Sequence, residues 1–240
     1  MGDKEAVTLR IGVLALQGGF FEHEASLMKA LKYHQFEKLI EMEVVEVRDP
    51  ENVADLDGLI LPGGESTTMG LFLRSNGLDV RIREWIHSPE RKAIAWGTCA
   101  GLILMSNSLE GQKGGGQDKL GGIDVTTSRN FFGRQLNSFE APLNLKSEEL
   151  ITAFRSRTKG LPVDQAGCHG VFIRAPAVMT INSPDVAVLA TVDLPTSDKP
   201  VIVAVSQNNM MATAFHPELT EDPGWHAYFL QKVLNAKSSS

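Results

Sequence analysis

The sequence predicts an α/β protein: a single domain with a mostly parallel, twisted sheet, helices on both faces and an antiparallel extension. In the first half of the chain, short apolar and β-branched runs alternate with helical patterns. This order favours parallel strands joined by crossover helices. From Gly122 onward, strand-like runs follow one another more closely, which favours antiparallel pairing. Hydrophobic residues make up 42% of the 240 positions, enough for one compact core.

The individual elements follow from these runs in order. In the first half, strands are predicted over residues 9–16, 42–47, 58–61 and 93–96, and helices over 21–33, 68–75, 78–87 and 100–106. In the second half, strands are predicted over residues 123–127, 138–145, 170–174, 186–191, 201–206 and 210–215, before a last helix over 225–234. We therefore expect an N-terminal extension (1–8), one domain (9–236) and a disordered tail (237–240).

Charge and composition exclude several classes of protein. The formal net charge of −6 argues against a nucleic-acid groove, which needs a concentrated basic surface. No apolar run is long enough to span a membrane, and the N-terminus does not resemble a targeting signal. Two cysteines cannot form a disulfide framework in a chain of this length, and they suit a reducing compartment. We expect a cytoplasmic protein that binds neither nucleic acid nor membrane.

The most informative motif is Gly97-Thr98-Cys99-Ala100-Gly101, between an apolar strand and an apolar helix. It has the pattern of the G-x-S-x-G nucleophile elbow, with a thiol in place of the hydroxyl. The flanking glycines allow the sharp turn, and the helix dipole favours the thiolate. The alternative is that Cys99 is a small buried core residue.

A nucleophilic cysteine needs a base and a group that orients the base, and His216-Pro217-Glu218 offers both. On an extended chain, positions 216 and 218 point to the same side. The alternative is an ordinary structural histidine. The sequence shows no carboxylate and nucleophile matched to the other helical or loop histidines, which are His23, His34, His87 and His226. Cys168 is interpreted as inert, and no cluster has the spacing of a metal site.

Two glycine-rich segments have different interpretations. The turn 62–68 follows the third strand, where a backbone N–H could face a developing oxyanion. It could equally be a simple loop in which Ser66 or Thr67 caps the next helix. Segment 111–122 lacks the Gly-Lys-Ser/Thr ending of a P-loop, so we expect a mobile surface loop there.

Taken together, these motifs resemble the class I (triad) glutamine amidotransferases, and among them the glutaminase subunits of pyridoxal 5′-phosphate synthase. The resemblance covers residues 10 to about 230. It is carried by LALQG (14–18), GGESTT (63–68), GTCAG (97–101), SRNFFGRQ (128–135), SFE (138–140), VFIRAP (171–176) and HPELT (216–220).

The resemblance implies a role for each matching residue. Cys99, His216 and Glu218 would form the catalytic triad that hydrolyses L-glutamine to glutamate and ammonia. The amides of Gly64 and Ala100 would bind the oxyanion. The residues that would hold glutamine are Gly64, Glu65, Ser66, Arg129, Ile173 and Arg174. An arginine suits the α-carboxylate, because its forked donors match a carboxylate.

The resemblance also implies a protein partner and no cofactor. The partner would be a (β/α)₈-barrel synthase subunit that receives the ammonia and activates the glutaminase. The residues matching the family's contact region are Gln17, Gly18, Gly19 and Phe20. The chain departs from compact bacterial members in its N-terminal extension, in the Gly-rich segment at 112–117, and around residues 146–168 and 193–199. These departures affect partner contacts more than chemistry.

Three alternatives remain open from the residues. The chain could be the glutaminase of another amidotransferase, although the Arg129-Asn130 and 173–176 stretches disfavour this. It could be a catalytically silent regulator on the same fold, which the intact triad residues disfavour. It could also be a general α/β hydrolase of esters or peptides.

Overall fold

The computed structural model describes residues 6–88, 92–111, 119–132, 138–156, 168–195 and 197–238. Its centre is a parallel sheet of five strands in the order β2-β1-β3-β4-β13. Their bounds are β1 (Ala6–Leu14), β2 (Leu39–Val47), β3 (Gly58–Leu61), β4 (Ile94–Thr98) and β13 (Met210–Thr213). Every residue of β3, β4 and β13 is buried, as expected for strands covered on both faces.

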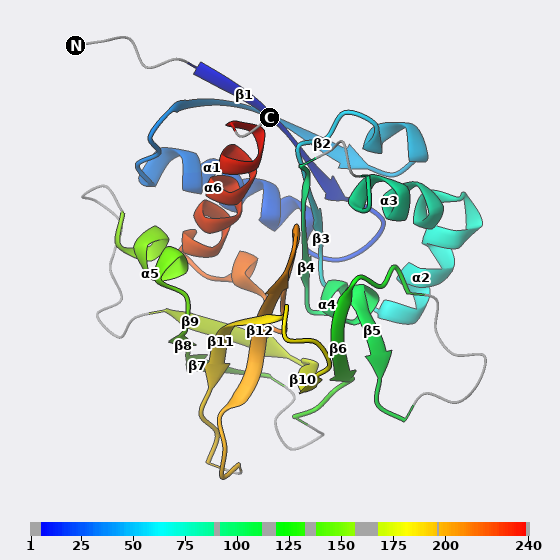
Figure 1. Cartoon of the computed structure of the whole chain (residues 1–240), viewed down its shortest axis with the longest axis vertical. Coiled ribbons are helices and arrows are strands. Elements are labelled where there is room, and N and C mark those ends of the chain that lie inside the picture. The colour runs from blue at the N-terminus through cyan, green and yellow to red at the C-terminus, as the bar shows by residue number, and fades with distance from the viewer. Residues whose placement is uncertain are drawn as a thin grey trace.

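Helices cover both faces of this parallel region (Figure 1). On one face lie α1 (Phe20–Tyr33) and α6 (Gly224–Ser238), with α5 (Glu148–Arg155) packed against α6. On the other face lie α2 (Ser66–Ser75), α3 (Leu78–Ile86) and α4 (Ala100–Met105). Two short 3₁₀ helices, η1 (Pro50–Val53) and η2 (Pro217–Leu219), complete the connections.

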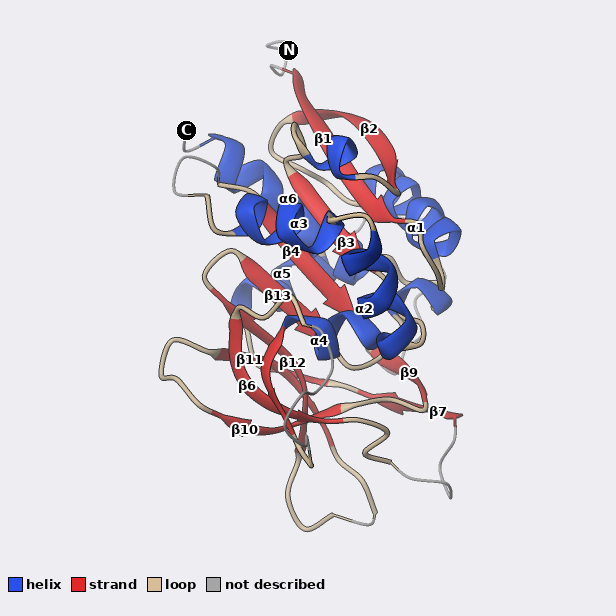
Figure 2. Ribbon diagram, turned by 90° about the vertical axis from the view of Figure 1, so that its right-hand side faces the viewer, coloured by secondary structure: helices blue, strands red, loops and turns tan. Residues whose placement is uncertain are grey.

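Beyond β13 the same sheet continues with mostly antiparallel pairs, in the order β12-β10-β6-β5. These strands gather at the end of the molecule opposite the start of β1 and the end of α6 (Figure 2). Their bounds are β5 (Ser106–Leu109), β6 (Ile123–Ser128), β10 (Ala177–Ile181) and β12 (Val201–Gln207). Off this path, β11 (Ala187–Val192) pairs with β12 and with β8 (Asn144–Leu145). A separate antiparallel pair joins β7 (Ser138–Pro142) to β9 (His169–Ile173). The predicted fold class is confirmed.

Several predicted boundaries and elements are wrong. The strand predicted over 138–145 is two strands in different sheets, β7 and β8. Strands β5 and β10 and helix α5 were not predicted. The helix is capped by the side chain of Ser147, which accepts a hydrogen bond from the Leu150 amide. The first turn of this helix is acidic and its apolar face is short, so the sequence shows little helical periodicity there.

Regular structure also extends past both predicted domain limits. β1 begins at Ala6, where its first residues pair with β2. Helix α6 includes Lys237 and Ser238, which were assigned to the tail. The Lys237 ammonium donates to the Thr8 carbonyl at 2.9 Å and to Asp57 at 2.7 Å, so tertiary contacts hold this last turn. Residues 112–118 of the predicted mobile loop lie outside the described residues. In the part of the chain that is described, no helix is both long and apolar enough to cross a membrane.

Candidate active site

A pocket of about 390 Å³ lies where the parallel strands end. In open parallel sheets, this is the edge where ligands bind. The loops after β1, β3, β4 and β13 all reach it, together with residues after β6 and at the end of β9. Its lining residues are Gly18, Gly19, Gly63, Gly64, Glu65, Ser66, Cys99, Ala100, Ile103, Arg129, Asn130, Ile173, Arg174 and His216.

Cys99 sits on a strained turn between β4 and α4. Its φ of 48° lies in the left-handed region, which costs energy for a residue with a side chain. Its amide donates to the Thr213 carbonyl at 2.8 Å, and this bond anchors the turn to the neighbouring strand. Both flanking glycines are required by close contacts: a Cβ on Gly101 would collide with the Leu61 carbonyl, and one on Gly97 would collide with the Gly101 backbone. The geometry is that of the predicted elbow.

His216 lies beside Cys99, and on its other side Glu218 Oε1 is 2.8 Å from His216 Nδ1. The backbone amide of His216 donates to the Val171 carbonyl at 2.8 Å, so β9 fixes the position of the His216 backbone. The prediction that the two side chains converge along an extended chain is wrong. Glu218 lies in η2, which begins at Pro217, and this tight turn brings the Glu218 carboxylate within hydrogen-bond distance of the His216 imidazole.

The electrostatics of this pair favour a charged imidazolium. Burial alone would lower the pKa of His216, but its hydrogen bonds with Cys99 and Glu218 raise that pKa to about 10. Burial likewise opposes the charge of Glu218, yet His23 and His216 lower the pKa of the carboxyl below its usual value. At neutral pH, His216 is therefore an imidazolium and Glu218 a carboxylate.

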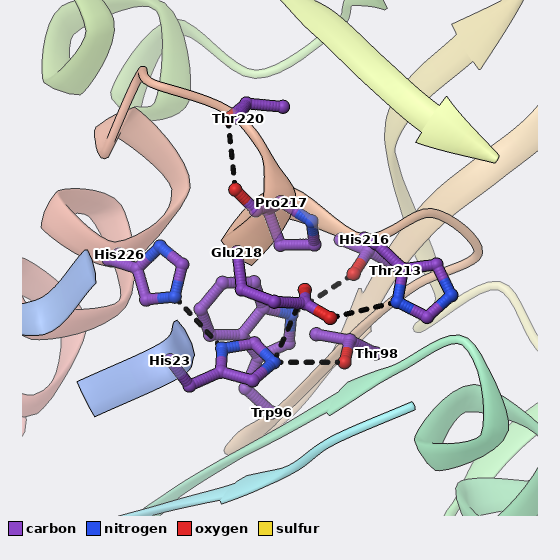
Figure 3. Close-up of polar contacts among 9 residues, drawn as sticks. All are labelled: His23, Trp96, Thr98, Thr213, His216, Pro217, Glu218, Thr220 and His226. Carbon is purple, nitrogen blue, oxygen red and sulfur yellow. Dashed lines mark hydrogen bonds and ion pairs between the residues drawn. The ribbon is translucent and has the colours of Figure 1, made fainter. Parts of the chain in front are cut away.

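Two buried histidines, which no motif in the sequence indicated, lie behind His216 and Glu218. His23, on α1, is fully buried, and its Nε2 is 3.3 Å from Glu218 Oε2 and 3.2 Å from Thr98 Oγ1. Its Nδ1 is 2.9 Å from Nε2 of the buried His226 on α6 (Figure 3). The prediction that no carboxylate matches His23 is therefore wrong. A signal was present: His23 shares one face of its helix with Leu27 and Ala30, at the spacing of a buried stripe.

The residues that the resemblance matches to glutamine binding lie around one pocket. Gly64, Glu65, Ser66, Arg129, Ile173 and Arg174 all line the pocket. Asn130 and Ile103 also line it, although the sequence analysis gave them no role. The described residues include four non-glycine residues with positive φ, and Cys99, Asn130 and Arg174 of these line the pocket. Strain of this kind concentrates at functional sites.

Helix α2 is capped by Glu65, and not by Ser66 or Thr67 as in the simple-loop alternative for the glycine turn. The helix begins at Ser66. The carboxylate of Glu65 accepts hydrogen bonds from the amides of Thr67 and Thr68 and from the Thr68 hydroxyl, which lower the pKa of Glu65 to about 2. The cap therefore holds a negative charge at the rim of the pocket.

The predicted partner-contact residues lie between β1 and the first turn of α1. Gln17 accepts a hydrogen bond from the Glu65 amide at 3.1 Å, so this loop is tied to the glycine turn. Gly18 and Gly19 line the pocket, and a Cβ on Gly18 would collide with the Gly63 carbonyl. Phe20 starts α1, and the Arg48 guanidinium lies 5.4 Å from its ring centre.

Cys168 is buried just before β9 and is not among the residues that line the pocket. Neither cysteine forms a disulfide. Among the described residues, histidine, cysteine, aspartate and glutamate side chains form no group of three or more that could hold a metal ion.

Comparisons with known proteins show the family of this chain. The model of the SNO glutamine amidotransferase family matches residues 13–235. A probable pyridoxal 5′-phosphate synthase subunit pdx2 from Dictyostelium discoideum is 39% identical, covering 96% of this chain and 95% of the relative. The pyridoxal 5′-phosphate synthase subunit SNO1 from Saccharomyces cerevisiae is 38% identical, covering 94% and 93%.

Solved structures show the same fold. A crystal structure of a glutamine amidotransferase superposes with a TM-score of 0.71 at 37% identity, covering 93% of this chain and 98% of the other. The glutaminase domain of a Trypanosoma brucei CTPS, at 12% identity and a TM-score of 0.54, shares the fold. The family match covers most of the chain and includes every residue of the pocket, so the chain belongs to the SNO glutamine amidotransferase family.

Proposed function

We propose that this chain hydrolyses L-glutamine with a Cys99–His216–Glu218 triad and supplies the ammonia to a pyridoxal 5′-phosphate synthase partner. The observation that carries the proposal is the pocket itself. It places Cys99, on its strained elbow, beside His216, whose imidazole is held by a buried carboxylate at 2.8 Å. Family membership and the names of the curated relatives point to the same activity.

The mechanism begins from the charged pair. The Cys99 thiolate attacks the side-chain amide carbon of glutamine, and the carbonyl electrons move onto the oxygen. The amides of Gly64 and Ala100 stabilise this oxyanion. His216, charged because its pKa is raised to about 10, gives a proton to the leaving nitrogen, and the C–N bond breaks to release ammonia.

The second half of the reaction restores the enzyme. Neutral His216 takes a proton from a water molecule, and the resulting hydroxide attacks the thioester. The C–S bond breaks, glutamate leaves, and the thiolate again faces an imidazolium. Glu218 acts throughout by fixing the imidazole tautomer and stabilising its charged form. The cycle needs no cofactor.

Substrate recognition uses the charges around the pocket. Glutamine carries an α-carboxylate and an α-ammonium group, each of which needs a partner of opposite charge. Arg129 and Arg174 line the pocket and offer forked donors for the carboxylate. Glu65, ionised because its pKa is lowered to about 2, offers negative charge for the ammonium group. Ser66, Ile173 and the Gly64 backbone complete the binding surface.

The ammonia would pass to a (β/α)₈-barrel synthase subunit that contacts the segment Gln17 to Phe20. Ammonia released into water is mostly protonated and no longer nucleophilic, so direct transfer to a partner is advantageous. Contact at this segment would reach the site, because Gln17 is hydrogen-bonded to Glu65. We place the reaction in the cytoplasm, where a catalytic thiol stays reduced.

The test is the Cys99→Ala variant in complex with the synthase subunit. We expect glutamine-dependent formation of glutamate and of pyridoxal 5′-phosphate to be lost, whereas ammonium salt should still support pyridoxal 5′-phosphate formation. Cys168→Ala is the matched control, since it removes the other buried thiol, and it should retain both activities. Glutamate release by Cys99→Ala at the wild-type rate would refute the assignment of the nucleophile.

A further inference from the structure

We infer that His23 is a positioning residue for the triad: its Nε2–H holds the second oxygen of Glu218, so that Glu218 presents its first oxygen to His216. This inference rests on the proposed function of Cys99, His216 and Glu218. It adds a fourth side chain, carried by α1, to a site whose other members lie on the turn between β4 and α4 and on the segment after β13.

The carboxylate of Glu218 is buried between two histidines. Its side chain is only 1% exposed, with Oε1 at 2.8 Å from His216 Nδ1 and Oε2 at 3.3 Å from His23 Nε2. Among the described residues, Oε2 has no hydrogen-bond partner of standard geometry, so the buried His23 Nε2 is a polar atom that faces an otherwise unsatisfied oxygen. The Gly19 backbone also lies close: a Cβ there would be 3.1 Å from Oε1. A buried carboxylate with one oxygen left unpaired would be costly, and His23 supplies the group that faces it.

The tautomer of His23 follows from its two neighbours. Burial keeps both His23 and His226 neutral, since it lowers each pKa to about 3. One of the two rings must then donate across the 2.9 Å contact between His23 Nδ1 and His226 Nε2. If His226 donates, the proton of His23 is on Nε2, where it faces both Glu218 Oε2 at 3.3 Å and Thr98 Oγ1 at 3.2 Å. The opposite arrangement would direct a lone pair at a buried negative charge, which is repulsive.

The two rings are held rigidly. Both lie edge-on to the buried Trp96 of β4, with ring centres 5.7 Å away for His23 and 4.9 Å for His226. The charged or titratable groups that face His23 are Glu218, His226 and His216. Figure 3 shows the resulting chain of contacts, from His226 through His23 and Glu218 to His216. The carboxylate of Glu218 fixes the direction, because it can only accept from the two rings beside it, so the Nδ1–H tautomer of His216 is favoured.

Three substitutions at position 23 separate positioning from packing. Gln can place an amide N–H near the position of imidazole Nε2, and so can keep the contact with Glu218. Asn is shorter, and its amide reaches only the position of Nδ1. Leu provides no donor. His34, another buried histidine at the end of α1, is not among the residues that line the pocket, so His34→Gln, His34→Asn and His34→Leu are matched controls.

The experiment measures glutamate release against pH for each variant in complex with the synthase subunit, together with its melting temperature. We expect His23→Leu and His23→Asn to lower kcat by about 10- to 100-fold, the loss of a hydrogen bond to a charged group, with little change in KM. The acid limb of the pH profile should move to higher pH, because a carboxylate without this donor is more easily protonated. His23→Gln should recover most of the rate and the wild-type acid limb, and the His34 variants should retain wild-type kcat.

Two results would overturn the inference. One is wild-type kcat in all three His23 variants. The other is an equal loss in all three, including His23→Gln, that follows melting temperature and leaves the acid limb in place, since this would indicate packing alone. Cys99→Ala, measured alongside, separates these outcomes from a failure of the proposed function: if it is inactive while the His23 variants are unaffected, only the inference about His23 fails.

Discussion

Replacing Glu218 with Gln changes the proposed triad at its most buried contact. The two side chains have nearly the same shape, and the position is 1% exposed, so the packing is retained. The charge, however, is lost. If the amide oxygen accepts from His23, its NH₂ group faces His216 Nδ1 at the position of the present 2.8 Å contact. His216 would then carry its proton on Nε2 and could not serve as the base in the second half of the reaction.

The magnitude follows from the electrostatics of His216. The difference between its pKa of about 10 and the usual 6.5 corresponds to a net stabilisation of the imidazolium of about 5 kcal/mol, in which burial opposes the contacts with Cys99 and Glu218. A hydrogen bond to a charged group contributes about 1.5–3 kcal/mol, and losing about 2 kcal/mol of imidazolium stabilisation lowers the rate about 30-fold. The wrong tautomer adds to this, and the corresponding change in a serine protease costs about 10⁴-fold in kcat. We therefore expect a loss in kcat of about 10²- to 10⁴-fold.

The assay is the rate of glutamate release by the complex with the synthase subunit, over a range of glutamine concentrations. KM should change little, because Glu218 lies behind His216 and is not among the residues that line the pocket. Glu221→Gln is the matched control: its side chain is 86% exposed and pairs only with Lys29 in the described contacts, so kcat should be unchanged. A Glu218→Gln enzyme with more than about a tenth of the wild-type kcat would refute the tautomer argument.

Three further predictions concern stability and binding. Gly101→Ala should lower both the melting temperature and kcat, because the added methyl group would collide with the Leu61 carbonyl and displace the elbow; an unchanged melting temperature would contradict this close approach. His23 and His226 have pKa values lowered to about 3, so between pH 6.5 and 3 the unfolded chain binds protons that the folded chain excludes, and stability should fall as the pH falls through this range. Urea unfolding at several pH values tests this, and the His226→Gln variant should show a shallower decline. Arg174→Met should raise the KM for glutamine by at least about tenfold while the melting temperature changes little, since Arg174 lines the pocket and its loss removes a forked donor; an unchanged KM would exclude it from carboxylate binding.

The site was predictable wherever chemistry depends on a few adjacent residues. The elbow required glycines on both sides of Cys99, and the structure shows the backbone contacts that require them. The pair at positions 216 and 218 was found for the same reason, although its local conformation was wrong: a 3₁₀ turn, not an extended chain, brings the side chains together. The parallel half of the fold followed from long apolar runs, which are typical of strands buried on both faces.

The contacts of His23 could not be predicted from local sequence patterns. His23 lies 195 positions from Glu218 in the sequence and 203 from His226, yet it contacts both. Its helical spacing indicated a buried face, but nothing local indicated a carboxylate opposite it. Helix α5 and strands β5 and β10 were missed for a related reason, because their short apolar faces become meaningful only when α6, β6 and β12 lie against them.

By itself, then, the sequence determined the fold class, the nucleophile candidate, its base and the family, because each depends on local patterns of size, charge and backbone freedom. The tertiary structure alone decided how these parts work together. It closed the loops after β1, β3, β4, β13 and β6 and the end of β9 around one pocket, and it placed two neutral histidines behind a buried carboxylate. Those contacts join residues far apart in the chain, and their strength depends on burial, which only the packed fold creates.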